Sequence, residues 1–155
     1  MPALRLSARA ALSAGLAVAI AELVRLPYPI YALIGAVIVS DLSPAKTRQL
    51  GLQRLMGTVL GAAVGALVSL FLPPAPWTIG LGVLIAMFLS QLLHMPAAAK
   101  LAGYVCGIVV ISHSGEAWSF GFYRLIETIL GIGMAVLVSF VPKLSPGNEA
   151  TPQKS

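Results

Sequence analysis

The chain has 155 residues, of which 58% are hydrophobic and 10% charged, with a formal net charge of +5. Soluble domains carry roughly 25% charged residues, so a soluble domain of this size would lack the charges to cover its surface. The segment from Leu55 to Leu93 contains no charged residue, and a membrane-spanning helix needs roughly 20 predominantly apolar residues. The composition therefore predicts an all-α integral membrane protein embedded in the lipid bilayer. The Lys and Arg residues form no basic stripe, so no nucleic-acid partner is expected.

Prolines and polar stretches divide the apolar sequence into six segments. We expect transmembrane helices at residues 8–26, 29–42, 53–72, 77–93, 97–112 and 120–141. The second and the fifth are short for a bilayer. Residues 1–143 are therefore expected to form one six-helix transmembrane domain. The Pro-rich polar residues 144–155 are expected to form a disordered cytoplasmic tail.

The first segment has a second interpretation. Arg5 and Arg9, followed by the Ala-rich residues 10–21, resemble a signal peptide with an Ala-x-Ala cleavage site at residues 17–19. The apolar stretch continues past that site to Leu26, and cleavage would remove part of the repeat described below. Both features favour a membrane helix.

The distribution of basic residues predicts the orientation in the membrane. With six spans, both termini lie on one side of the bilayer, together with the loop expected at residues 41–53. Eight basic residues then fall on the side of the termini, namely Arg5, Arg9, Lys46, Arg48, Arg54, Lys100, Lys143 and Lys154. Only Arg25 and Arg124 remain for the other side. Cytoplasmic loops are enriched in Lys and Arg, so we expect both termini in the cytoplasm. The membrane itself is expected to be a bacterial inner membrane.

The sequence repeats itself at an offset of 70 residues. The segment from Gly51 to Gly61 aligns with the segment from Gly121 to Gly131, and both carry Arg, Leu, Thr, Leu and Gly at matching positions. The third and sixth helices are therefore equivalent. Because three spans separate them, they cross the membrane in opposite directions. We expect an inverted 3+3 repeat, with repeats at about 8–72 and 77–141, an architecture found in many secondary transporters.

Small residues recur at every fourth position of the third segment, at Gly57, Gly61 and Gly65, and Gly131 lies at the position equivalent to Gly61. Small residues let membrane helices approach closely, so helix packing is the simplest role for these glycines. The alternative is that part of this face lines a transport path. The sequence does not separate the two.

Five polar residues in the repeated boxes are candidate substrate-binding residues: Arg54, Thr58, Arg124, Glu127 and Thr128. Paired arginines, one towards each mouth of the protein, would attract anions, because a guanidinium binds carboxylates through two hydrogen bonds. Each arginine also has a simpler role, reaching the lipid headgroups from a helix end. Glu127 replaces Gly57 of the other repeat. It is either a functional carboxylate or a structural partner of Arg124 or Arg25, with Glu22 completing a cluster of four charges.

No enzymatic chemistry is expected. The single cysteine, Cys106, lies within an apolar segment and has no metal-ligand spacing around it. The sequence contains no phosphate-binding glycine loop, no zinc-protease motif and no plausible nucleophile–histidine–acid set. We therefore expect no catalytic residue, no metal and no cofactor.

The repeated boxes, together with the aromatic segment before the second helix, resemble one family. The resembling segments are Tyr28-Pro29-x-Tyr31, residues 36–39, Thr47-Arg48, residues 53–61 and residues 124–131. They are similar to the fusaric acid resistance and aromatic acid exporter proteins, over about residues 9–141. The plant aluminium-activated malate transporters are similar more distantly. The resemblance implies a membrane transporter domain for organic acids or other anions.

Family members of this kind usually carry a second membrane half or a large cytoplasmic domain. A chain with one six-helix unit is therefore expected to form a homodimer or a higher homo-oligomer. Two functions follow from these observations. The first is a small transporter or channel for organic anions, such as aromatic or carboxylic acids. The second is a non-transporting membrane scaffold or accessory subunit that associates through its small-residue helix faces.

Overall fold

The computed structural model describes residues 2–112 and 117–141, which fold into six helices. The helices are α1 (Pro2–Leu23), α2 (Pro29–Val39), α3 (Pro44–Phe71), α4 (Pro76–Leu92), α5 (Pro96–Ser112) and α6 (Ala117–Ser139). The tail expected at residues 144–155 lies outside the described residues. The described chain is thus all-helical.

Proline sets the start of the first five helices, each of which begins at a proline. Proline favours the first helical position because its fixed φ suits the helix and its missing N–H would have no helical partner there. At α3, Ser43 has an extended conformation and Pro44 follows as the first helical residue. The same residues that end one apolar segment therefore begin the next helix.

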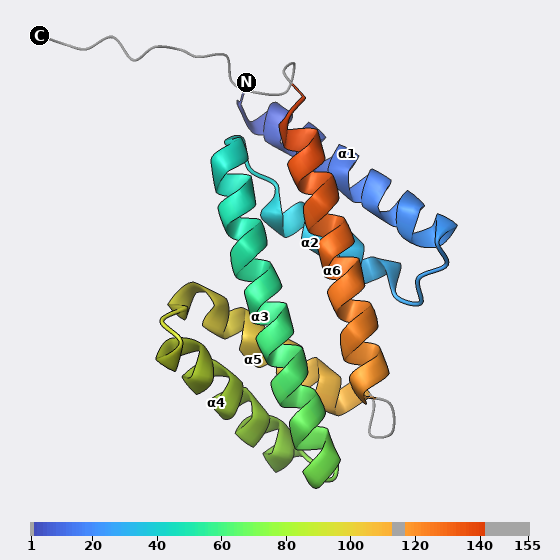
Figure 1. Cartoon of the computed structure of the whole chain (residues 1–155). Coiled ribbons are helices and arrows are strands. Elements are labelled where there is room, and N and C mark those ends of the chain that lie inside the picture. The colour runs from blue at the N-terminus through green and yellow to red at the C-terminus, as the bar shows by residue number, and fades with distance from the viewer. Residues whose placement is uncertain (1, 113–116, 142–155) are drawn as a thin grey trace, which may run out of the picture.

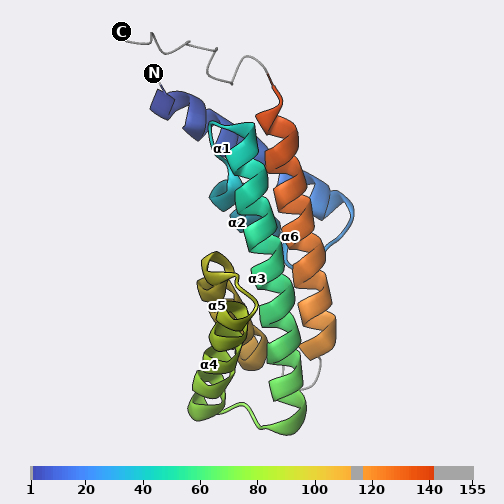
Figure 2. The same ribbon diagram turned by 60° about the vertical axis from the view of Figure 1, so that its left-hand side comes forward.

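The two longest helices, α3 and α6, form the centre of the molecule. They lie side by side and run in opposite directions, as both views show (Figure 1, Figure 2). The α4–α5 hairpin packs against α3, and the α1–α2 hairpin packs against α6 (Figure 1). Each long helix therefore packs mainly on the hairpin of the other half of the chain. The start of α1 and the end of α6 lie at the same end of the molecule (Figure 1).

The two hairpins turn in the same way. Arg25 after α1 and His94 after α4 both have positive φ, at 57° and 58°. In each turn the next N–H returns to a carbonyl five residues earlier, from Leu26 to Ala21 at 2.8 Å and from Met95 to Ser90 at 2.9 Å. This is the left-handed helix ending that glycine usually provides. Neither turn contains glycine, so no residue pattern predicts this ending.

Small side chains fill the interior and large apolar side chains cover the outside. The buried residues are mostly Ala, Val, Gly, Ser and Thr, and the three apolar clusters consist largely of Ala and Val. In contrast, Leu23, Phe71 and Phe88 are 83%, 81% and 66% exposed. Close helix contacts through small residues, with large apolar groups facing outward, are typical of a protein surrounded by lipid.

Three helical segments are long and apolar enough to cross a membrane, namely Ala3–Leu23, Pro44–Phe71 and Trp118–Ser139. The remaining three are apolar but shorter. With 11 residues, α2 extends about 16 Å, roughly half of the hydrocarbon thickness. The short helix expected at 29–42 ends at Val39, and six complete spans remain a prediction.

The expected helix boundaries also need two corrections. The third helix begins at Pro44, nine residues before the predicted start at Gln53, so the expected loop at 41–53 is mostly helix. Residues 44–52 are too polar to resemble a membrane span, but they contain strong helix formers after a proline start. The first helix likewise begins at Pro2 instead of Ala8. Its Ala17 and Ala21 are fully buried against α2 and α6, so α1 is part of the fold.

Candidate functional site

Arg54 of α3 and Arg124 of α6 are both buried inside the helix bundle, with exposed fractions of 1% and 2%. The α2 helix lies against both side chains. The Tyr31 ring packs on the Arg124 guanidinium, and a Cβ added at Gly35 would lie 3.7 Å from Arg54 Nε. Tyr31 and Gly35 are four residues apart, so one turn of α2 faces both arginines.

Aromatic rings surround the Arg124 guanidinium. Its central carbon lies 3.9 Å from the centre of the Tyr31 ring and 5.7 Å from the centre of the Tyr104 ring on α5. Tyr28 and Phe120 extend the aromatic cluster, with their ring centres 5.1 Å apart. Cation–π contact of this kind stabilises a desolvated guanidinium by about 2 kcal/mol. The contact uses the face of the guanidinium and leaves Nε and Nη1 available to bind in the plane.

Both guanidiniums leave N–H donors without partners. Nε and Nη1 of Arg54, and the same two nitrogens of Arg124, are buried and donate to no acceptor in the described part of the chain. Among the residues that the structure describes, no carboxylate forms an ion pair with either arginine. A buried donor without a partner costs about 1–3 kcal/mol, and more when the group is charged. An acceptor placed beside these donors would remove that cost.

The two arginines lie near one another. Both side chains lie against the same turn of α2, Arg124 at Tyr31 and Arg54 at Gly35. This differs from the expected placement towards opposite mouths of the protein. The long side chains extend inward from antiparallel helices, so helix-end positions in the sequence become neighbours in the interior. Burial also excludes the simpler role of reaching the lipid headgroups.

Glu127 is fully buried and binds the start of α2. Its Oε1 accepts a hydrogen bond from the backbone N–H of Tyr28 at 2.7 Å, whereas its Oε2 is buried without a partner. In the described part of the chain, Glu127 forms no ion pair with Arg124 or Arg25. Glu22 and Arg25 are exposed, so the expected cluster of four charges does not form.

The two threonines of the repeated boxes are also buried, each with an exposed fraction of 1%. The Thr58 hydroxyl donates a hydrogen bond to the carbonyl of Arg54 at 2.9 Å, within the same helix. The hydroxyl proton of Thr58 is therefore already engaged in a hydrogen bond to the backbone. Thr128 contributes its carbonyl to the wall beside Gly35, 3.5 Å from an added Cβ at that glycine.

The glycines of the repeated boxes lie at helix contacts. An added Cβ at Gly57 would lie 2.6 Å from Leu101 Cβ, and one at Gly65 would lie 2.9 Å from Val109 Cβ, both on α5. At Gly61 it would overlap the Ala102 carbonyl oxygen of α5, and at Gly131 the Ala32 carbonyl oxygen of α2. These faces pack against helices of the same chain. They are therefore not open to a partner protein.

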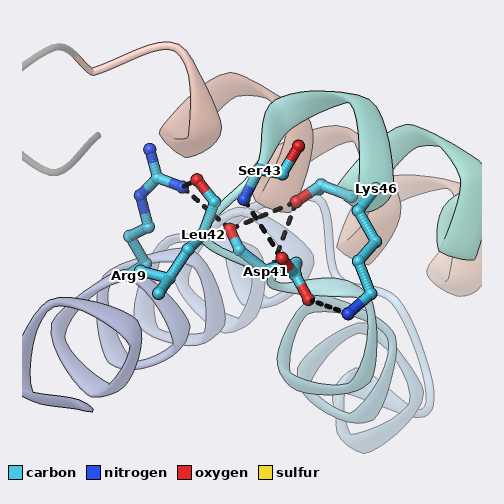
Figure 3. A network of polar contacts seen from close by, with 6 residues as sticks. Arg9, Asp41, Leu42, Ser43 and Lys46 are labelled. Atoms are coloured by element: carbon cyan, nitrogen blue, oxygen red, sulfur yellow. Dashed lines mark hydrogen bonds and ion pairs between the residues drawn. The ribbon is translucent and has the colours of Figure 1, made fainter. Parts of the chain in front are cut away.

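Arg9 has a structural role that the sequence did not reveal. Its guanidinium donates to the carbonyl oxygens of Asp41 at 2.8 Å, Leu42 at 2.7 Å and Ser139 at 3.0 Å. Figure 3 shows the Arg9 side chain reaching the link between α2 and α3. There, Asp41 accepts from the Ser43 N–H and forms an ion pair with Lys46. Arg9 was expected only to contribute to the orientation in the membrane.

An apolar hollow of about 200 Å³ lies between α3 and α6. It is lined by Val59, Ala62, Ala63, Ala66, Trp118, Gly121, Phe122 and Leu125. None of these side chains is charged, so this hollow does not provide the donors that an anion requires. The buried arginines remain the candidate functional site.

Comparison with known proteins finds one family. The sequence model of a family described as fusaric acid resistance protein-like matches residues 16–138. The matched segment contains both arginines, Glu127 and all four packing glycines discussed above. No curated protein and no solved structure matches the chain.

Proposed function

The chain belongs to the fusaric acid resistance protein-like family, and on that premise we propose that it is a transporter or channel for organic anions. The family implies an integral membrane protein with a transporter-like role in general. The anion as cargo is our proposal. Carboxylates, aromatic ones included, match the planar fork of a guanidinium.

One observation carries this proposal. Two buried arginines from the two longest helices present partnerless N–H donors to the interior of a lipid-facing bundle. Ionisable residues inside membrane proteins are costly and usually serve function. An oxyanion supplies both the missing acceptors and the missing negative charge. Thr58 and Thr128, one helical turn after each arginine, are buried as well.

We further propose that all six helices lie in the membrane as an inverted 3+3 repeat. Three features support this arrangement. The long helices α3 and α6 are antiparallel (Figure 1). Each packs on the hairpin of the other half, and α1 and α4 end in the same left-handed turn, at Arg25 and His94. The short helix α2 would then reach only part of the way across the bilayer, as in transporters whose sites lie beside broken helices.

Both termini are proposed to face the cytoplasm of a bacterial inner membrane. Three of the ten basic residues, Arg9, Arg54 and Arg124, are buried and so do not report orientation. Of the others, only Arg25 falls on the outer side. Single-cysteine labelling on a Cys106→Ala background tests this, with probes at the exposed residues Ala45 and Ser119. If the Ala45 probe is labelled from outside intact cells, the orientation is the opposite of the one proposed.

A homodimer is also proposed, but not through the packing glycines. The space beside those glycines is occupied by α5 and α2 of the same chain. The hollow between α3 and α6, which is lined partly by small residues, is the surface where a second copy would find close contact. Mass measurement in mild detergent, corrected for bound detergent, distinguishes a dimer from a monomer.

The alternative function is a membrane scaffold or accessory subunit. The small-residue helix faces are the main support for this alternative. In the structure those faces pack against other helices of the same chain. A scaffold also has no use for two buried arginines without partners. The transport proposal therefore explains more of the structure.

The decisive experiment is anion flux into liposomes that contain the purified protein. We expect Arg124→Gln to reduce flux at least tenfold without loss of assembly. Arg48→Gln, which changes an exposed arginine of α3, is the matched control and should transport like the wild type. Normal flux from a well-folded Arg124→Gln protein would end the transport proposal in this form.

A further inference from the structure

We propose that Arg54 and Arg124 bind one and the same oxyanion, which bridges α3 and α6 and makes the site a single one shared by the two halves of the chain. The inference rests on the proposed function and adds the number of anions, their chemistry and their place. The alternative is two separate sites, one for each repeat.

The placement of the side chains favours one site. Both guanidiniums face a single turn of α2, between Tyr31 and Gly35. Two like charges against one helical turn repel one another, and within the described residues each guanidinium keeps Nε and Nη1 without a partner. Two separate anions would bring two negative charges as close together as the arginines. One anion between the arginines removes the repulsion without adding another.

The free donors define the chemistry of the ligand. The Tyr31 ring covers the Arg124 guanidinium at 3.9 Å, so a ligand binds this arginine through N–H groups in the plane. In-plane binding by two arginines requires at least two acceptor oxygens that point in different directions. Carboxylate, sulfate and phosphate groups have this geometry, and a guanidinium binds them through paired hydrogen bonds. A halide is a single spherical ion without separate acceptor oxygens, so it matches the four N–H donor positions less well.

Glu127 limits the charge of the ligand and does not supply the missing acceptor. Its Oε1 already accepts from the Tyr28 N–H at 2.7 Å, and Oε2 forms no hydrogen bond with either arginine. Two guanidiniums beside one carboxylate carry a net charge of +1, or +2 when the carboxyl is protonated. A bound oxyanion of charge −1 or −2 therefore neutralises the site.

Calorimetric titration of the purified full-length chain in lipid nanodiscs tests the shared site. Sodium sulfate and sodium benzoate are the probes, at constant ionic strength. The wild type should bind one anion per chain. Arg54→Gln and Arg124→Gln should each weaken that binding at least tenfold, because each removes half of the donors from one site. Arg48→Gln should bind within twofold of the wild type.

Two independent sites would give a different result. The wild type would then bind two anions, and each Gln variant would retain one site of unchanged affinity. That result would overturn the shared site, and arginine-dependent flux in liposomes would still support the proposed function. Binding of neither probe by the folded wild type would overturn the shared site as well.

A second pair of variants guards against a folding defect. Arg54→Lys and Arg124→Lys keep the positive charge but lose the planar fork. If both arginines bind one oxyanion, each Lys variant should bind that anion several-fold more weakly. The number of anions bound per chain should stay at one. Unchanged affinity in both Lys variants would contradict in-plane binding and with it the proposal.

Discussion

Glu127 on α6 accepts a hydrogen bond from the backbone N–H of Tyr28, 99 positions earlier in the chain, at 2.7 Å. The bond joins the sixth helix to the start of the second. Tyr28 immediately precedes α2, where helix N–H groups have no helical partners. Glu127 therefore fixes the position of α2, and α2 in turn presents Tyr31 and Gly35 to the two arginines.

Replacing Glu127 should separate its structural role from its electrostatic one. Glu127→Gln keeps an oxygen that accepts the Tyr28 N–H and removes any negative charge beside Arg124. We expect unchanged thermal stability and tighter binding of sulfate, because the net charge of the site becomes more positive. Glu127→Leu leaves the N–H without an acceptor and should cost about 1–3 kcal/mol of stability. Equal destabilisation by Gln and Leu would mean that the carboxylate charge is needed for folding.

Arg9 offers a second test of how the helix ends are joined. It donates to carbonyls of the α2–α3 link and of Ser139, the last residue of α6. Arg9→Gln should destabilise the fold by about 2–4 kcal/mol, because hydrogen bonds from a charged donor are worth about 1.5–3 kcal/mol each and some will re-form with water. Arg5→Gln, at an exposed position of the same helix, is the control. Thermal unfolding in detergent measures both, and equal midpoints would refute the structural role of Arg9.

The sequence predicts the helices well because prolines and polar breaks bound them. It also identifies both arginines and Glu127, since charges are rare in an apolar chain. It could not identify their partners. The hydrogen-bond partners of Arg9 and Glu127 are backbone groups of distant segments, whose positions depend on the complete fold. The early start of α3 was missed for a related reason, because hydropathy locates the lipid-facing part of a helix and not its whole length.

The link between α2 and α3 predicts a limited dependence of stability on pH. The Ser43 N–H, at 3.1 Å, and the Lys46 ammonium, at 3.0 Å, hold the pKa of Asp41 below its ordinary value. A carboxyl with a lowered pKa in the folded state stabilises the fold above its unfolded pKa of about 4. That stabilisation is lost as the pH falls through the folded pKa.

Asp41→Asn isolates this effect, because the amide oxygen can still accept the Ser43 N–H. We expect the wild type to exceed the variant in stability by less than about 1 kcal/mol at neutral pH, since Lys46 is largely exposed. The difference should be constant between pH 7 and 5 and should shrink below about pH 4. Melting curves at several pH values provide the measurement. A difference that grows on acidification has the wrong sign for this explanation.

Two glycines on α6 make a matched pair for testing the helix contacts. At Gly131 an added Cβ would overlap the Ala32 carbonyl oxygen of α2 and lie 2.9 Å from the Ala36 nitrogen. At Gly133 nothing lies within 4 Å of an added Cβ. Gly131→Ala must therefore move α2 away from α6, whereas Gly133→Ala adds a methyl group in open space. Overpacking of this kind costs about 1–3 kcal/mol.

The consequence should extend from stability to binding. Gly131 lies one turn after Glu127, so displacement of α2 also shifts Tyr31 and Gly35 relative to the arginines. We expect Gly131→Ala to lower the unfolding temperature and to weaken sulfate binding several-fold. Gly133→Ala should match the wild type in both measurements, or be slightly more stable because alanine restricts the unfolded chain. If Gly131→Ala lowers neither the unfolding temperature nor the affinity for sulfate, the contact between α2 and α6 is looser than the structure shows. In that case α2 does not hold the anion site in place.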